Sequence, residues 1–432
     1  MSGGADRVVI VGGGFSGAML AARLAERGRA SVLIDRTGRF GLGVAYSTPF
    51  IGHLLNVRSA KMSAVEGRPD DFVEWLKAHE PDLADPDDFA PRQVYGRYVQ
   101  DRLAAVEAAR PGLIERITGE VASIHDIGVR LADGRAFAGP VVLATGNPAP
   151  RTAGGGGRIV PDPWAPGALE RVGPDDDVVI IGTGLTMVDM VQVLVARGWR
   201  GRAVALSRRG LAPRAHREQP DTPVDLTPQA LTGPLSSRLK AARRAGGLDG
   251  WRTVMEAYRP ITARLWTEAD VRQRGRMVRH LRPWWDVHRH RIAARIDAAL
   301  GALADAGRLT VRAGRVTEVG QSEDGVRVAW RPRAGGGAEP LIGAWLIDCT
   351  GPGHDAARDA LTGPLIAAGR ARLDPLGLGL DLDDRGRVID ATGQADPRLF
   401  VLGPPARAAF WETIAVPDIR KRIEDVVEAL GA

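Results

Sequence analysis

Three glycines near the start of the chain are spaced in a way that suits a dinucleotide. Gly12, Gly14 and Gly17 follow the apolar run VVIV and open a helical pattern. In this spacing the first glycine allows a tight turn, the second lets the backbone approach a pyrophosphate, and the third lets helix and strand pack closely. The phosphates would lie at the helix N-terminus, beside Phe15 and Ser16. The motif therefore predicts a dinucleotide site.

An acidic residue follows at the place where such a site holds a ribose. The next apolar strand, ASVLIDR, ends in Asp35 and Arg36. A carboxylate here hydrogen-bonds ribose hydroxyls and would repel a 2′-phosphate. We therefore expect the first site to bind a nucleotide with a free ribose. The alternative is a glycine-rich turn that serves packing only.

A second glycine-rich turn lies in the middle of the chain, in the run VVIIGTGLTMVDM. It contains Gly182 and Gly184, followed by Leu185 and Thr186 at the start of a helical pattern. Met187 stands where the third glycine would be, so this helix must sit further from its strand or pack differently. We expect a second dinucleotide to bind here.

The strand after the second turn ends without an acid. It reads RAVALS and ends in Ser207, Arg208 and Arg209. Serine and arginine can bind a 2′-phosphate that an acid would repel, so this site is predicted to take NADP(H). The alternative is that both arginines are simply solvated in an arginine-rich chain.

Each glycine turn opens one of two parallel halves. In each half, a strand, turn and helix precede a long middle, a β-meander and an apolar strand that ends in Thr-Gly (VVLATG and WLIDCTG). Such a repeat indicates architecture. We expect an α/β fold with two Rossmann-like dinucleotide-binding domains, β-meanders and a helical insertion at about residues 210–300 in the second. The expected first domain comprises residues 1–150 and 346–432, and the second 151–345, joined by the Gly- and Pro-rich hinge NPAPRTAGGGGRIVPDPWAPG.

Composition excludes several other classes of protein. The 432 residues are 44% hydrophobic and 25% charged, without an apolar run as long as the about 18 residues of a membrane span. The N-terminal MSGGADR leads directly into a strand, which favours a cytoplasmic location. The net charge of +6 comes from arginines scattered among acids, so no nucleic-acid partner is expected. The single cysteine, Cys349, excludes a dithiol centre within the chain and is expected to be a small buried side chain.

The layout resembles the two-dinucleotide-binding-domain flavoproteins. In these the first glycine turn holds FAD, the second holds NAD(P)H, and the C-terminal segment completes the FAD domain. The LATG and DCTG strand ends and the segment GRVIDATGQADPRLFVLG carry this resemblance. The stretches GVAYSTPFIGHLLNV, GTGLTMVD, RHLRPWWDVHRHR and FWETIAVPDIR are similar to bacterial FAD/NAD(P)-binding proteins that include FAD-dependent urate hydroxylase-like proteins, related to N-hydroxylating flavin monooxygenases.

The resemblance implies further cofactor contacts outside the glycine turns. The tail FWETIAVPDIRKRIEDVVEAL reads as a strand-to-helix junction, with Pro417 and Asp418 at the start of the helix. Backbone N–H groups before that helix would lie near the flavin pyrimidine. The residues implied to contact FAD are Val121, Ala144, Thr145, Gly146, Gly403, Trp411 and Thr413.

The activity that the resemblance implies is hydroxylation of a small molecule with molecular oxygen, through a flavin hydroperoxide formed after NADPH reduces FAD. Catalytic candidates are His53 and Asn56 in the loop YSTPFIGHLLNV, which would contact the flavin ring or donate to the peroxide. The alternative is that both only hydrogen-bond the loop. His288 and His290 are two residues apart on a helical pattern, so no metal site is expected.

Two other functions fit the same sequence. One is an NADPH-dependent flavin reductase or oxidase that inserts no oxygen, and the other is a flavin-binding protein without turnover. The sequence leaves the oligomeric state open, and a homo-oligomer is compatible with it.

Overall fold

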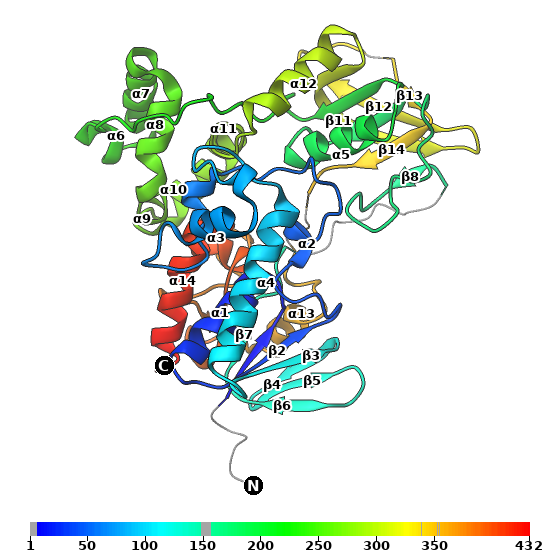
Figure 1. The fold of residues 1–432 in the computed structure, drawn as a ribbon. Helices are drawn as coiled ribbons and strands as arrows, with labels where there is room; N and C mark the ends of the chain where they lie inside the picture. Colours follow the sequence, from blue (N-terminus) through cyan, green and yellow to red (C-terminus); the bar gives the residue numbers. More distant parts are fainter. Residues whose placement is uncertain (1–6, 148–156, 338, 352, 354) are drawn as a thin grey trace.

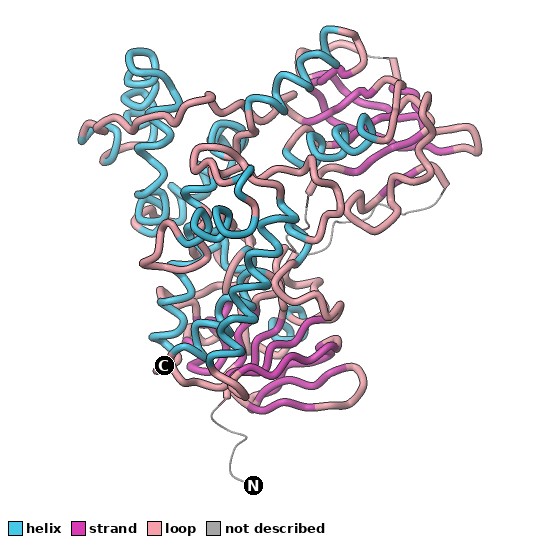
Figure 2. Tube along the Cα trace, viewed as in Figure 1, coloured by secondary structure: helices cyan, strands magenta, loops and turns pink. Residues whose placement is uncertain are grey.

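Two mainly parallel sheets carry the two glycine turns in the computed structural model of this chain (Figures 1 and 2). The structure describes residues 7–147, 157–337, 339–351, 353 and 355–432. Nine of the 21 residues of the expected hinge, 148–156, lie outside the described residues. Helices gather on one side of the view and the strands form two separate groups, which matches the expected α/β fold with two Rossmann-like halves.

The first sheet combines strands from both ends of the chain, in the order β15-β16-β7-β1-β2-β3. The C-terminal β16 pairs in parallel with β7, so the last segment returns to the first half as the resemblance implied. Apolar runs such as VVIV are buried on both faces, as in most parallel sheets. The strands are β1 (Val8–Val11), β2 (Ser31–Asp35), β3 (Ile114–Thr118), β7 (Val141–Leu143), β15 (Arg387–Ile389) and β16 (Ala395–Val401).

The two faces of the first sheet are covered differently. A helical layer packs on one face, and a small meander with a short helix packs on the other. The helical layer consists of α1 (Phe15–Glu26), α3 (Asp71–His79), α4 (Arg92–Ala109) and α14 (Val416–Ala429), and α2 (Gly43–Tyr46) lies above it. The opposite face carries β4 (Val121–His125), β5 (Gly128–Leu131), β6 (Ala136–Ala138) and α13 (Thr362–Ala367).

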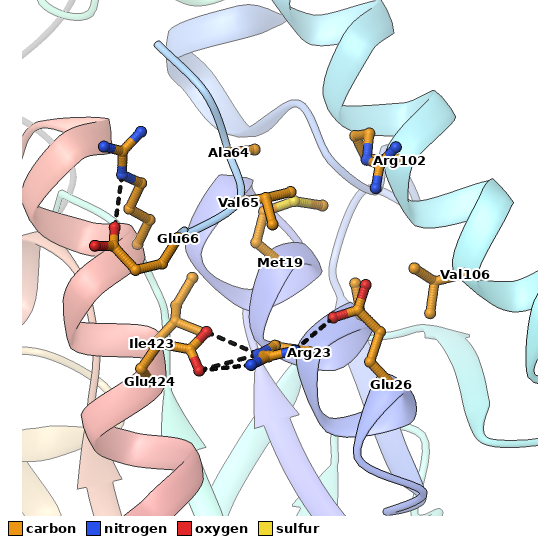
Figure 3. A pocket seen from close by; sticks show the side chains of 12 residues that line it. Met19, Arg23, Glu26, Ala64, Val65, Glu66, Arg102, Val106, Ile423 and Glu424 are labelled. Carbon is orange, nitrogen blue, oxygen red and sulfur yellow. Dashed lines mark hydrogen bonds and ion pairs between the residues drawn. The ribbon is translucent and has the colours of Figure 1, made fainter. Parts of the chain in front are cut away.

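Charged pairs fasten the C-terminal helix α14 to α1 (Figure 3). Arg23 Nε donates to both oxygens of Glu424, at 2.8 and 3.0 Å, and Arg23 Nη1 donates to Glu26. Arg420 on α14 pairs with Glu66 at 2.8 Å. The cavity that these side chains border measures about 30 Å³, which suits one water molecule and no cofactor.

The second sheet has the order β13-β12-β11-β10-β9-β14-β8. Its helices α5 (Leu185–Ala196) and α12 (Ala294–Asp305) share one core with the sheet. β14 continues to Asp348, so this sheet extends three residues past the expected division at residue 345. The strands are β8 (Ile159–Val160), β9 (Val178–Ile181), β10 (Ala203–Ser207), β11 (Leu309–Gln321), β12 (Val326–Pro332), β13 (Leu341–Gly343) and β14 (Trp345–Asp348).

The two meanders differ in how they join their sheets. β11 is one 13-residue strand that pairs with β10 and then with β12. In the first half the chain turns at Gly119 between β3 and β4, so no single strand continues from the sheet into the meander. A Cβ at Gly119 would lie 2.7 Å from the side chain of Leu131, which packs against the turn where the meander folds back.

The helical insertion lies between β10 and α12 and contacts the first half beside α3 and α14 (Figure 1). Asp270 caps α10 by accepting a 2.7 Å hydrogen bond from the N–H of Gln273. The helices are α6 (Pro228–Leu231), α7 (Leu235–Ala245), α8 (Trp251–Tyr258), α9 (Thr262–Thr267), α10 (Val271–Arg276) and α11 (Arg282–Arg289), with π segments at Gly246–Gly250 and Met277–Leu281.

Candidate functional site

The first glycine turn has the close backbone approaches that its spacing predicts. Gly12 has a φ of +108°, and a Cβ there would lie 2.3 Å from the carbonyl oxygen of Ala144. A Cβ on Gly17 would lie 1.9 Å from the carbonyl oxygen of Gly12. Gly14 is the N-cap of α1 and has no side chain to occupy the first N–H groups of the helix. These N–H groups can therefore donate to a phosphate.

Asp35 lies beside this turn as an ionised acceptor. Its carboxylate accepts hydrogen bonds from the N–H of Gly13 at 2.9 Å and from the N–H and hydroxyl of Thr37 at 2.8 and 2.7 Å. Burial acts to raise the pKa of Asp35, but these hydrogen bonds outweigh it and lower the pKa. Arg36, also predicted at the cofactor, has an exposed side chain.

The other residues implied to contact FAD come from three separate segments. Gly403 has a φ of +79°, and a Cβ there would lie 2.5 Å from Ser16 Oγ at the start of α1. Thr145 and Gly146 directly follow Ala144, which touches Gly12. Val121 begins β4, shortly after Thr118, the register partner of Asp35. The fold thus gathers these residues around one turn.

The second glycine turn repeats the first with different side chains. Gly182 has a φ of +101°, and a Cβ there would lie 2.2 Å from the carbonyl oxygen of Cys349, the counterpart of Ala144. Thr183 and Ser207 are the counterparts of Gly13 and Asp35 in the first turn. Thr183 Oγ1 lies 2.8 Å from Ser207 Oγ, where the first turn has a hydrogen bond from the N–H of Gly13 to Asp35. Met187 is buried at the position that Gly17 has in the first turn.

The strand end after the second turn borders an open cleft that the sequence reasoning missed. Ser207 pairs in register with Ala313 of β11, and the cleft beside Ala313 has a volume of about 450 Å³. Its lining includes Arg312, Trp330 and Arg333. The signal in the sequence was the run RVAWRPRAG, but only the parallel pairing of β10 with β11 brings it to Ser207.

The two arginines after Ser207 differ in their surroundings. Arg208 is exposed, whereas Arg209 donates a long 3.4 Å hydrogen bond to the carbonyl oxygen of Arg279 in the insertion. Arg208 is therefore the freer of the two to meet a phosphate. Leu185 and Thr186 begin α5 directly after Gly184, where helix N–H groups are available.

His53, a catalytic candidate from the sequence, lies buried between the loop and α5, and its role at the flavin stays a prediction. It is 2% exposed, its Nδ1 lies 2.7 Å from Thr48 Oγ1, and its Nε2 lies 3.1 Å from the carbonyl oxygen of Asp189 on α5. Both ring nitrogens are therefore used, and burial lowers the pKa of the imidazole. Arg92 adds a two-pronged bond to the Asp189 carboxylate at 2.9 and 3.1 Å. His53 thus connects the two halves.

Asn56, the other catalytic candidate, lies at a second contact between segments. Its carbonyl oxygen lies 3.1 Å from Nε2 of His216, in the part of the insertion before its first helix α6. The residue is half-buried. Its role at the flavin therefore stays a prediction.

The segment before α14 forms turns rather than the expected strand. The residues from 410 to 415 make hydrogen bonds among themselves and pack against the insertion. Thr413 N donates to the carbonyl oxygen of Phe410 at 3.0 Å. Trp411 packs against Trp266 with ring centroids 4.6 Å apart. The hydroxyl of Thr413 is buried and has no hydrogen-bond partner among the described residues.

The helix after this segment begins as expected. Pro417 lies in the first turn of α14, where a missing N–H costs nothing, and Asp418 is an acid of the same turn.

The tryptophan- and histidine-rich stretch serves packing. Trp285 Nε1 donates to Glu412 at 3.0 Å, and His288 Nδ1 lies 2.7 Å from the carbonyl oxygen of Trp284. Within the described ranges no group of three or more His, Cys, Asp or Glu could hold a metal ion. Cys349 is buried as expected, and burial raises the pKa of its thiol.

Comparisons with known proteins agree with this geometry. Residues 9–148 match the family model described as FAD-NAD(P)-binding. No curated protein sequence matches the chain. Among solved structures, an ornithine N-hydroxylase of Kutzneria sp. 744 is 16% identical with a TM-score of 0.69, and the match covers 99% of each chain.

Two further solved structures share the fold over the whole chain. An L-lysine 6-monooxygenase of Pseudomonas syringae is 16% identical with a TM-score of 0.65, covering 99% of each chain. A cadaverine monooxygenase of Erwinia amylovora, bound to FAD, is 13% identical with a TM-score of 0.67, covering 99% of this chain and 95% of its own. The chain therefore has the fold of these monooxygenases. In its described part no helix is both long and apolar enough to cross a membrane.

Proposed function

We propose that this chain is an FAD- and NADPH-dependent monooxygenase that hydroxylates a small molecule. The observation that carries the proposal is the pair of glycine turns with opposite chemistry in one chain. The first ends in an ionised Asp35, and the second ends in Ser207 beside an arginine-lined cleft. An acid suits a free ribose and a hydroxyl with arginines suits a 2′-phosphate, so the two sites fit FAD and NADPH respectively.

The residues of the first half fit FAD. A Cβ on Gly12 would lie 2.3 Å from the carbonyl oxygen of Ala144 and one on Gly403 would lie 2.5 Å from Ser16 Oγ, so the close backbone approach around the α1 N-terminus depends on these glycines. No capping side chain occupies the first N–H groups of α1. Asp35 would bind the ribose, and the unpaired hydroxyl of Thr413 would donate to the flavin pyrimidine. When bound, FAD supplies hydride acceptance from NADPH and the activation of molecular oxygen.

The residues of the second half would bind and orient NADPH. The N–H groups at Gly184, Leu185 and Thr186 would bind its pyrophosphate. Arg208 and Arg312 would bind the 2′-phosphate, and Trp330 would stack on the adenine. The contacts of His53 and Arg92 with Asp189 would fix the orientation of α5 toward the first half.

Small amines are the first substrates to test, because the three solved structures with this fold are named for hydroxylation of ornithine, lysine or cadaverine. The cytoplasmic location and a homo-oligomeric state stay predictions.

The stoichiometry of oxygen use tests the proposal. FAD-loaded protein is supplied with NADPH, oxygen and each candidate amine, and NADPH consumed, hydrogen peroxide and hydroxylated product are measured together. A monooxygenase yields product in proportion to NADPH with little peroxide for at least one amine. Peroxide alone with every substrate would favour the flavin oxidase, and no NADPH consumption would favour a flavin-binding protein without turnover.

A further inference from the structure

The helix α7 packs only loosely against the rest of the molecule. It belongs to an arm of three helices, α6, α7 and α8, which projects away from both sheets (Figure 1). None of the 11 residues of α7 is buried. A helix of this length is only marginally stable in water by itself and normally depends on packing against a partner. The single chain supplies little of that packing.

The side chains of α7 also lack polar partners. Within the described part of the chain, none of them makes a hydrogen bond or an ion pair. The neighbouring helix α8 is attached to the body instead. Arg252 donates to the carbonyl oxygen of Ala215, and Glu256 pairs with Arg291 and, at 3.1 Å, with Lys61 of the first half. The arm is therefore held at α8 and free at α7.

The free end of the arm is basic and partly apolar. We call residues 235–248, which comprise α7 and the turn after it, the arm tip. Leu235 and Leu239 are only half-buried, and Leu248 is 78% exposed. Residues 226–248 contain no acid and four basic side chains, Arg238, Lys240, Arg243 and Arg244. A surface of this composition fits a partner that offers carboxylates around an apolar contact.

A segment of the first half has the opposite charge. Residues 62–90, which include α3, carry nine acidic and two basic residues, a net charge of −7. Four of these acids pair with arginines of the same chain. The other five are exposed and form no ion pair with a described residue, and we call them the acidic face: Asp70, Glu74, Asp82, Asp85 and Asp87.

A second copy of the chain is the partner that suits both surfaces. A nucleic acid or an anionic membrane would pair with the arm tip but would be repelled by the acidic face. A basic protein would pair with the acidic face and leave the arm tip uncovered. In a two-fold arrangement of two copies, the arm tip of each meets the acidic face of the other. Four basic side chains then face five carboxylates at each contact.

We propose that two copies of this chain associate through the arm tip of each and the acidic face of the other. This association is independent of the proposed activity. Contact removes the leucines of the arm tip from water, which supplies most of the affinity. Exposed ion pairs contribute little individually, so the charges mainly set the orientation of the two copies and exclude other partners.

The test begins with the oligomeric state of the FAD-loaded full chain. Sedimentation velocity is recorded over a range of chain concentrations, at low and at high salt. We expect a dimer whose dissociation constant rises with salt, because salt screens the attraction between exposed charges.

Charge reversal assigns the contact to the two surfaces. The arm variant combines Arg243→Glu with Arg244→Glu, and the acid variant combines Asp82→Lys with Asp87→Lys. All four side chains are exposed, so the fold should tolerate the changes, and circular dichroism with bound FAD checks this. Each variant brings like charges together, and each is expected to raise the dissociation constant about tenfold or more.

The matched control reverses two charges outside both surfaces. Arg385 and Arg398 are exposed, and their side chains form no ion pair with a described residue. The control variant, Arg385→Glu with Arg398→Glu, makes the same change in net charge as the arm variant. It should leave the dissociation constant unchanged.

Mixing the arm variant with the acid variant tests the complementarity directly. In a mixed pair, the acidic arm tip of one copy meets the basic face of the other, and the second contact keeps its native charges. We therefore expect the mixture to form dimers of nearly unmodified affinity, although neither variant does so alone. A variant that had merely lost structure would not recover in this way.

Four results would overturn the proposed association. They are a chain that stays monomeric at every concentration, a dimer that resists both reversals, two variants that do not complement each other, and a monomeric chain that binds a polyanion through the arm tip. Duplex DNA and vesicles of phosphatidylcholine with phosphatidylglycerol are the polyanion probes. Binding of either that is lost in the arm variant would assign the arm tip to that polyanion.

Discussion

At the scale of single residues, two glycines control the two proposed cofactor sites separately. Gly12 and Gly182 have φ values near +100°. A Cβ at either position would lie little more than 2 Å from a carbonyl oxygen. Alanine at either position would strain the backbone and push apart the turn and the strand that follows it, at about 1–3 kcal/mol or more.

The two alanine variants should therefore fail differently. Gly12→Ala is expected to lose most bound FAD, measured as flavin absorbance per protein. Gly182→Ala is expected to retain FAD and lose most of its reduction by NADPH, measured by anaerobic stopped flow. Each variant is the other's control, and equal loss of FAD in both would contradict separate sites.

Ser207 should determine the choice between NADPH and NADH. Ser207→Asp restores the carboxylate that Asp35 provides in the first half and would repel the 2′-phosphate, so we expect NADP⁺ affinity to fall about tenfold to a hundredfold. Ser207→Ala removes only the hydroxyl and should have a small effect. Calorimetric titration with NADP⁺ and NAD⁺ measures this, and unchanged NADP⁺ affinity in Ser207→Asp would contradict the assignment of the site.

A buried histidine should make the fold sensitive to acid. Burial, with Arg291 nearby, lowers the pKa of His216 to about 3 from its ordinary value near 6.5. Between these values the unfolded chain takes up a proton that the folded chain does not bind, so stability falls as the pH drops from 6.5 towards 3, by up to about 5 kcal/mol. Denaturant unfolding at several pH values measures this loss of stability. The loss at low pH should be smaller in His216→Gln than in the unmodified chain, and unchanged in the exposed control His280→Gln. Equal acid sensitivity of both variants would contradict it.

At the scale of elements, the contact between the loop at His53 and α5 joins the two halves, and the catalytic role suggested for His53 stays a prediction. The glycine turns and the strands around them could be predicted, because their signals are local. His53 could not, because its partner Asp189 is 136 residues away. The turns at 410–415 were mistaken for a strand for the same reason, since Trp411 is fixed by Trp266 in the insertion.

The ion pair between Arg92 and Asp189 should be important for stability. Both side chains are largely buried, and Asp189→Asn leaves Arg92 without its counter-charge, at a cost of about 3–5 kcal/mol. The pair of Arg200 with Asp175 has similar two-pronged geometry but is exposed, so Asp175→Asn should lower stability far less. Denaturant midpoints of Asp189→Asn and Asp175→Asn compare the two ion pairs. Similar losses of stability would contradict a larger contribution from the buried pair.

At the scale of the whole molecule, the architecture could be predicted further than the site for the substrate. The repeated order of strand, turn, helix and meander indicated two dinucleotide-binding halves, and the sheets have that order. The cleft at Arg312 was missed, because it is assembled from strands that only the folded chain brings together. The proposed activity depends on electron transfer from the second half to the first.

Anaerobic mixing of the FAD-loaded chain with NADPH or NADH tests that transfer most directly, with flavin absorbance as the readout. The account predicts that NADPH bleaches the flavin rapidly and that NADH does so much more slowly, with the colour returning when oxygen is admitted. A flavin that stays oxidised with NADPH would contradict the central claim, and equal rates with both nucleotides would contradict the assignment of the second site to NADPH.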